Sequence, residues 1–159
     1  MNPRILDIRK KLLVGEHVNT NLIKDQTGEL WKNFGPKIKH IHNISSSDKY
    51  SLQIYPKDYF KHFNPHTKFT KWAAVEVQHI NSIPAGMETL TINAGLYAIF
   101  HYIGSSTDKS IFNYIYGEWI PKSGYVLDDR PHFEVLGKKY RNNDSSSEED
   151  IYIPIKKLT

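Results

Sequence analysis

A single carboxylate stands inside a short apolar segment toward the end of the chain. Residues 131–137 read Pro-His-Phe-Glu-Val-Leu-Gly, which places Glu134 between Phe133 and Val135. Side chains alternate across a strand, so we expect Phe133 and Val135 to face the helices and Glu134 to face the open side of a sheet. An ionised carboxylate is costly to bury without a partner. Glu134 is therefore solvated, paired with a cation such as Arg130, or the contact for a positively charged ligand.

Other patterns that could support chemistry are weak. The chain has no cysteine, which excludes disulfides, thiolate metal sites and a cysteine nucleophile. The histidine pairs His40/His42 and His62/His66 have no third ligand at a clear spacing. Neither a phosphate-binding loop nor a nucleophile elbow is present. We expect no metal ion and no cofactor.

Charge and composition favour an ordinary soluble protein. The 159 residues carry a net charge of +4 with no block of like charges, so the concentrated basic stripe of a nucleic-acid binder is missing. Aromatic residues make up 13% of the chain, and its ten tyrosines suit half-wet pockets. No apolar segment is long enough for a signal peptide or a membrane span. We expect a cytoplasmic protein without membrane contact.

Hydrophobic periodicity predicts a β-α-β-β order that occurs twice. Apolar residues spaced by three and four mark one helix in each half, and alternating or continuous apolar runs mark the strands. The predicted helices span 25–43, divided at Gly35-Pro36, and about 107–119; the predicted strands include 11–15, 50–55, 72–78, 132–136 and 151–155, with a β-rich run over 87–102. We expect one α+β domain over 1–159, with repeats at about 10–80 and 86–156. One antiparallel sheet would carry both helices on one face and a ligand cleft on the other.

The two halves align at one informative position. Leu52-Gln53-Ile54 in the first half corresponds to Phe133-Glu134-Val135 in the second. Gln53 is therefore expected at the position related to Glu134 by pseudo-symmetry, so that only one half of the cleft carries a charge.

The sequence resembles the GyrI-like domain, which is the effector-binding domain also fused to AraC-type and MerR-type bacterial regulators. The resemblance covers about Lys10 to Ile155. It rests on short segments in a fixed order: Leu13-Val-Gly15, Leu30-Trp31 with Phe34, Met87-Glu-Thr-Leu90, Gly95-Leu-Tyr-Ala-Ile-Phe, Gly104, Trp119-Ile-Pro-Lys-Ser-Gly-Tyr125, Asp129-Arg-Pro-His-Phe-Glu134 and Ile151-Tyr-Ile-Pro-Ile155. That family has two βαββ repeats with a ligand cleft along their pseudo-twofold axis.

The resemblance implies binding of bulky, lipophilic and cationic small molecules, with Glu134 as the acidic residue of the cleft. The predicted ligand-binding residues are Glu134, Trp119, Tyr125, Tyr97 and Gln53. Tyr55 and Trp72 are weaker candidates, for which a core or surface position is the better interpretation. Too few residues precede the first predicted strand to form a helix-turn-helix, so we expect a stand-alone member that does not bind DNA directly.

Three functions stay open at this level. The first is a receptor or sequestering protein for a lipophilic cation held by Glu134. The second is a hydrolase of electrophilic small molecules, with Glu134 as general base and Tyr125 or Tyr97 as acid. The third is a gyrase-inhibitor-like module, although no residue in the sequence identifies a protein partner.

Overall fold

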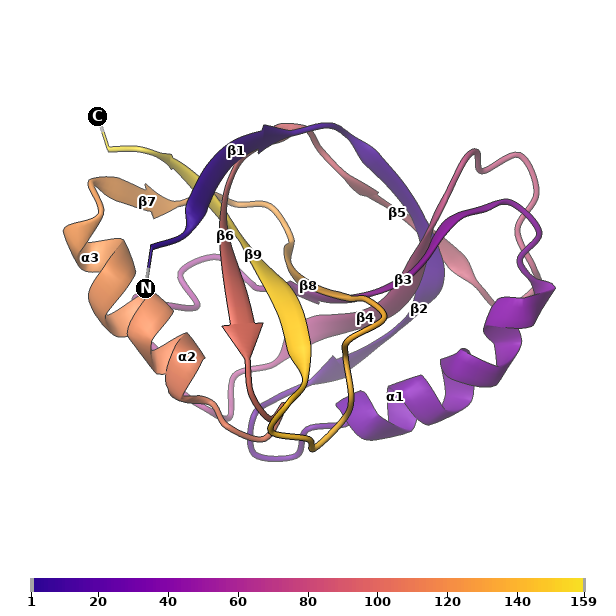
Figure 1. Cartoon of the computed structure of the whole chain (residues 1–159), viewed down its shortest axis with the longest axis horizontal. Helices are drawn as coiled ribbons and strands as arrows, with labels where there is room; N and C mark the ends of the chain where they lie inside the picture. The colour runs from indigo at the N-terminus through magenta and orange to yellow at the C-terminus, as the bar shows by residue number, and fades with distance from the viewer. Residues whose placement is uncertain (1, 159) are drawn as a thin grey trace.

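A curled antiparallel sheet with two helical segments forms the protein in a computed structural model that describes residues 2–158 (Figure 1). The predicted α+β class is confirmed. The strands follow one another across the sheet as β1 (Arg4–Ile8), β6 (Gly95–Ile103), β9 (Glu148–Lys157), β8 (His132–Leu136), β3 (Ile44–Ile54), β4 (Phe69–Val77), β2 (Lys11–Thr20) and β5 (Glu88–Ile92). The short β7 (Tyr125–Leu127) pairs with β9 outside this path.

The order of the strands is symmetric about the central pair β8 and β3. Moving outward, β9 corresponds to β4, β6 to β2 and β1 to β5, so the two halves of the sheet share one connectivity. Leu52 of β3 pairs with Phe133 of β8, next to the pair of Ser51 and Glu134 at the middle of this central ladder. The chain therefore brings 52–54 and 133–135 side by side, although about eighty residues separate them.

Each helical segment is interrupted, as its prolines require. The first comprises α1 (Thr27–Phe34) and a 3₁₀ segment η1 (Gly35–His40), which begins where Pro36 supplies no backbone N–H. The second comprises α2 (Ser110–Tyr114), a π-helical turn η2 (Ile115–Trp119) and α3 (Ile120–Lys122), and it ends before Gly124. Figure 1 shows the two segments on opposite sides of the central strands.

Two strand assignments from the sequence are wrong. Residues 4–8 form the edge strand β1, which was missed because two charged residues interrupt its short apolar pattern. The strand predicted over 50–55 begins earlier, because residues 44–49 extend β3 through an irregularity in its pairing with β4 despite their three serines. The β-rich run predicted over 87–102 forms two strands, with Asn93 and Ala94 between β5 and β6.

The face of the sheet that carries the helices, here the helix face, follows from the strand register. Ala73, Ser51, Glu134 and Ile151 form one row across β4, β3, β8 and β9. Helix α1 packs against Ala73 through Leu30 and Phe34, and the second helical segment packs against Ile151 through Ile111 and Ile115. Glu134 therefore lies on the helix face, in the part of the row between the two helical segments.

The neighbouring row lies on the opposite side, here the inner face, and it is filled. Trp72, Leu52, Phe133 and Tyr152 form this row, and they pack with other strand residues into a core without any helical member. The predicted alternation around Glu134 is correct, but the predicted faces are reversed. The sheet curls so far that strand side chains alone form the described core on its inner face, and the helices cover the other side.

Candidate functional site

Glu134 is a buried carboxylate with one hydrogen-bond donor. Its exposed fraction is 9%, and Nε2 of Gln53 donates to its Oε1 over 3.3 Å. Burial raises the pKa of Glu134, whereas the positive charge of Lys71, the Gln53 hydrogen bond and the charge of Lys109 oppose this shift without cancelling it. The predicted neighbours Gln53 and Glu134 are thus brought into direct contact.

Lys71 is a second buried charged group on the same face. It lies on β4 opposite Gln53, and its exposed fraction is 6%. Burial lowers the pKa of Lys71, and the negative charge of Glu134 is the largest opposing influence. No ion pair joins Lys71 to Glu134 in the described part of the chain, so the two opposite charges are neighbours without direct contact.

His132 lies beside them as a neutral polar group. It pairs with Gln53 in the sheet, and its Nδ1 lies 2.8 Å from the hydroxyl of Tyr116 in η2. Burial, and to a smaller extent the charge of Arg130, lowers the pKa of His132 to about 3. Neutral Nδ1 then accepts the hydrogen bond that the Tyr116 hydroxyl donates.

Five aromatic side chains form a cluster around these polar groups, here the aromatic cover: Tyr55, Tyr59, Phe60, Phe69 and Tyr116. Phe60 stacks on Tyr116 with ring centroids 4.5 Å apart, and Tyr55 contacts His132 edge-on at 4.9 Å. Burial raises the pKa of both Tyr55 and Tyr116, and the charge of Glu134 contributes to each shift. The cover is therefore in direct contact with His132, and Tyr55 and Tyr116 lie close enough to Glu134 to be influenced by its charge.

A second carboxyl group faces Glu134 from β9. Glu149 precedes Ile151 by two residues and so lies on the same side of its strand, diagonal to Glu134. Burial raises the pKa of Glu149 to about 7, and repulsion from Glu134 is the second cause. In the sequence, Glu149 stands in a run of acidic residues, which gives no sign of its burial.

Residues 4–155 match the family of integron-associated effector-binding proteins named Cass2. The chain belongs to the Cass2 family. The resemblance to GyrI-like effector-binding domains stated from the sequence is thereby confirmed. No curated protein matches the chain.

Solved structures similar to this Cass2-family chain show the same fold. SAV2435 bound to tetraphenylphosphonium is 16% identical over 98% of this chain and 94% of that one, with a TM-score of 0.71. An integron cassette protein from Vibrio cholerae is 15% identical over 98% and 96%, with a TM-score of 0.67. The C-terminal domain of EcmrR is 10% identical over 99% and 98%, with a TM-score of 0.73.

Three predicted ligand-binding residues of the Cass2-family chain lie away from Glu134. Tyr97 is on the inner face, where it is fully buried and its hydroxyl donates to the carbonyl of Pro131 over 2.8 Å. Trp119 packs edge-on against Phe100 of β6, with centroids 5.2 Å apart, and stacks on Tyr125 at 6.3 Å. The structure does not bring these three side chains together with Glu134: Tyr97 lies on the inner face, whereas Trp119 and Tyr125 pack around Phe100 with the second helical segment.

Of the weaker candidates, Tyr55 joins the aromatic cover and Trp72 does not. Trp72 lies on the inner face with its ring 4.5 Å from that of His17. Three further members of the cover, Tyr59, Phe60 and Phe69, come from the connection between β3 and β4 and from its end. An aromatic-rich connection that follows the Gln53 strand was a usable signal in the sequence, but the polar residues between its aromatic ones obscure it.

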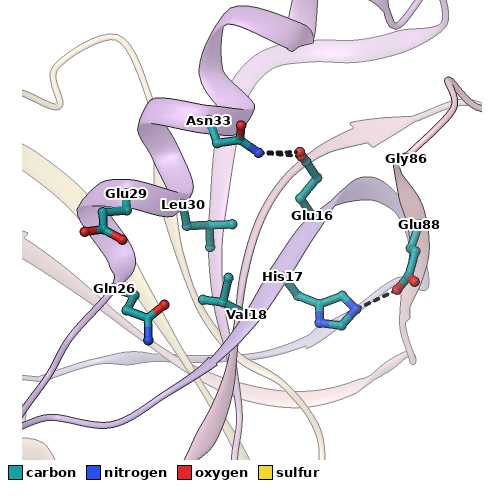
Figure 2. A pocket seen from close by; sticks show the side chains of 9 residues that line it. All are labelled: Glu16, His17, Val18, Gln26, Glu29, Leu30, Asn33, Gly86 and Glu88. Carbon is teal, nitrogen blue, oxygen red and sulfur yellow. Dashed lines mark hydrogen bonds and ion pairs between the residues drawn. The ribbon is translucent and has the colours of Figure 1, made fainter.

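A separate hollow lies away from Glu134. A cavity of about 410 Å³ lies between α1, β2 and the segment before β5, and Figure 2 shows its side chains. Two of its acidic groups have partners: Glu16 accepts hydrogen bonds from Asn33 at 3.0 Å and Lys37 at 2.9 Å, and Glu88 lies 2.6 Å from His17. The third, Glu29, is exposed. This hollow has no unpaired buried group, so the chemistry favours the enclosed Glu134 site.

Residues 2–158 contain no group of three or more His, Asp or Glu side chains placed to hold a metal ion. None of the helices in this range has the length and apolar content needed to cross a membrane.

Proposed function

We propose that the protein is a receptor or sequestering protein for a lipophilic cation, with Glu134 as the ionic anchor. One observation carries the proposal: Glu134 is a buried carboxylate whose hydrogen-bond donor is the neutral amide of Gln53. A buried carboxylate without an ion pair is costly, and a ligand cation removes that cost. The ionic contact also explains why an acid is held on an otherwise apolar strand.

The aromatic cover supports the lipophilic part of the proposal. A cation enclosed by tyrosine and phenylalanine rings gains roughly 0.5–2 kcal/mol from each good ring contact, in addition to buried apolar area. The ring contacts around His132 and Tyr116 give such a surface within one cluster. SAV2435 has the same fold and was solved with tetraphenylphosphonium, a compound of this chemical class.

Ligand entry requires the aromatic cover to move. Glu134 is 9% exposed and the cover lies close to it, so a bulky ligand reaches the carboxylate only when some of these rings turn aside. Rings of the aromatic cover that lose contact with one another would then contact the ligand, so that little apolar contact is lost in total.

The test is calorimetric titration with tetraphenylphosphonium and with neutral triphenylphosphine oxide. Glu134→Gln keeps the shape of the side chain and removes its charge, so we expect at least about tenfold weaker binding of the cation, or about 1.4 kcal/mol. Binding of the neutral compound should change little. Glu118→Gln, at an exposed position on η2, is the control for loss of one negative charge. Equal losses for both compounds would contradict the ionic role of Glu134.

The hydrolase alternative has less support from the geometry. It required Tyr97 or Tyr125 as an acid next to Glu134, and both side chains lie in other clusters. A role as a gyrase-inhibitor-like module stays a prediction from the resemblance alone.

A further inference from the structure

Lys71 is a buried cation that the proposed function does not use. Its β4 position places it on the helix face with Ala73 and opposite Gln53, the residue that donates to Glu134. Its exposed fraction is 6%, which is unusual for a lysine. The groups whose charges reach it are Glu134, Asp25, Lys109 and Glu149, which come from four different segments of the chain.

The ammonium group of Lys71 has no hydrogen-bonding partner among the described residues. Because Lys71 is only 6% exposed, little water reaches its three N–H groups, and no acceptor among the described residues replaces that water. The hydroxyl of Tyr59, in the aromatic cover, is a fully buried donor without a partner in the described part of the chain. The site therefore has more hydrogen-bond donors than it can satisfy by itself.

We propose that Lys71 is a second anchor, which selects lipophilic cations that also carry an acidic or strongly accepting group. This inference rests on the proposed function of Glu134. A ligand with a cationic centre at Glu134 and a carboxylate at Lys71 pairs both buried charges at once. A monocation without an acceptor pairs only Glu134 and adds a second positive charge near Lys71.

The test uses two probes of similar size. (4-Carboxybutyl)triphenylphosphonium carries a cation and a carboxylate, whereas pentyltriphenylphosphonium has a methyl end in place of the carboxylate. The pentyl compound is the more lipophilic, so buried apolar area alone favours it. We expect the wild-type protein to bind the carboxybutyl compound at least about tenfold more tightly in calorimetric titrations at neutral pH.

The variants separate Lys71 from general effects of charge. Lys71→Met keeps an unbranched apolar stem and should remove the preference or reverse it. Lys122→Met, at an exposed position on α3, removes the same charge and should keep the preference. Thermal unfolding of each variant shows whether it is folded, and the wild-type comparison alone already tests the selectivity.

The outcomes distinguish the two proposals. Two outcomes overturn the role of Lys71 and leave Glu134 as an anchor. In the first, the wild-type protein binds the pentyl compound at least as tightly as the carboxybutyl compound. In the second, Lys71→Met still prefers the carboxybutyl compound. If wild type binds neither probe, both proposals fail. Glu134→Gln should weaken both probes, since each presents the same phosphonium centre.

Discussion

Nε2 of Gln53 donates a 3.3 Å hydrogen bond to Oε1 of Glu134 across the two central strands. The two side chains lie diagonally, because Glu134 pairs with Ser51 at the middle of the ladder and Gln53 pairs with His132. A donor on one carboxylate oxygen favours the charged form, and Gln53 is the hydrogen-bonding group that opposes the effect of burial. The contact holds Glu134 in position through one of its two carboxylate oxygens.

Replacing Gln53 by leucine should raise the pKa of Glu134 further. The substitution removes the hydrogen bond that lowers this pKa, while the burial that raises it stays. The pKa can be read from the side-chain carboxyl carbon shift in an NMR titration of the wild-type and variant proteins. An unchanged or lower value in Gln53→Leu would show that the amide does not stabilise the charged carboxylate.

The sequence predicted the Glu134–Gln53 relationship because it depends on strand register, which side-chain alternation and the internal repeat largely determine. It also predicted the strand 132–136 with its exact bounds and the division of the first helical segment at Gly35-Pro36. These features follow from local patterns, which a single sequence contains.

The face of the sheet could not be predicted in the same way. Phe133 and Val135 are apolar, and an apolar row is equally consistent with packing under helices or with filling the inside of a curled sheet. The decision depends on β1 and β5 at the two sheet edges, which close the inner face, and β1 was not recognised. Lys71 and Glu149 were missed because a charged residue in or beside a strand ordinarily faces solvent.

His132 should make stability depend on pH in mildly acidic solution. Its pKa is about 3 in the folded protein and about 6.5 in an unfolded chain. Between these values the unfolded chain binds a proton that the folded protein does not, so stability is lost as pH falls, by up to about 1.4 kcal/mol per pH unit. His132→Asn keeps an acceptor for the Tyr116 hydroxyl and should reduce this slope in urea unfolding measured from pH 7 to pH 4. Equal slopes in both proteins would contradict a neutral, buried His132.

Tyr55 should contribute to binding of an aromatic cation, whereas Tyr125 should not. Tyr55 belongs to the aromatic cover, with its ring 4.9 Å from that of His132. Tyr125 instead stacks on Trp119 of the second helical segment. Loss of one ring contact in Tyr55→Leu should weaken tetraphenylphosphonium by roughly three- to tenfold. Tyr125→Leu is the matched control in the same calorimetric titration. A larger effect of Tyr125→Leu would place the ligand beside Trp119, as the sequence had suggested.

Gly15 should tolerate no side chain, because β2 and β4 approach each other closely there. Gly15 pairs with Ala74, and a Cβ added to it would lie 2.0 Å from the carbonyl oxygen of Ala73, far inside contact distance. Backbone atoms cannot turn aside as a flexible side chain does, so Gly15→Ala must separate the strands beside the row that holds Glu134. We expect a destabilisation of at least about 2 kcal/mol in urea unfolding.

Gly28→Ala is the matched control for that substitution. Gly28 lies in α1, and no atom is within 4 Å of a Cβ added there. Alanine favours the helix over glycine by up to about 1 kcal/mol, so this variant should be equally stable or more stable. If Gly15→Ala instead unfolds at the wild-type urea concentration, the close approach of β2 to Ala73 is wrong. The position of α1 above Ala73, which forms one side of the Glu134 site, would then need revision as well.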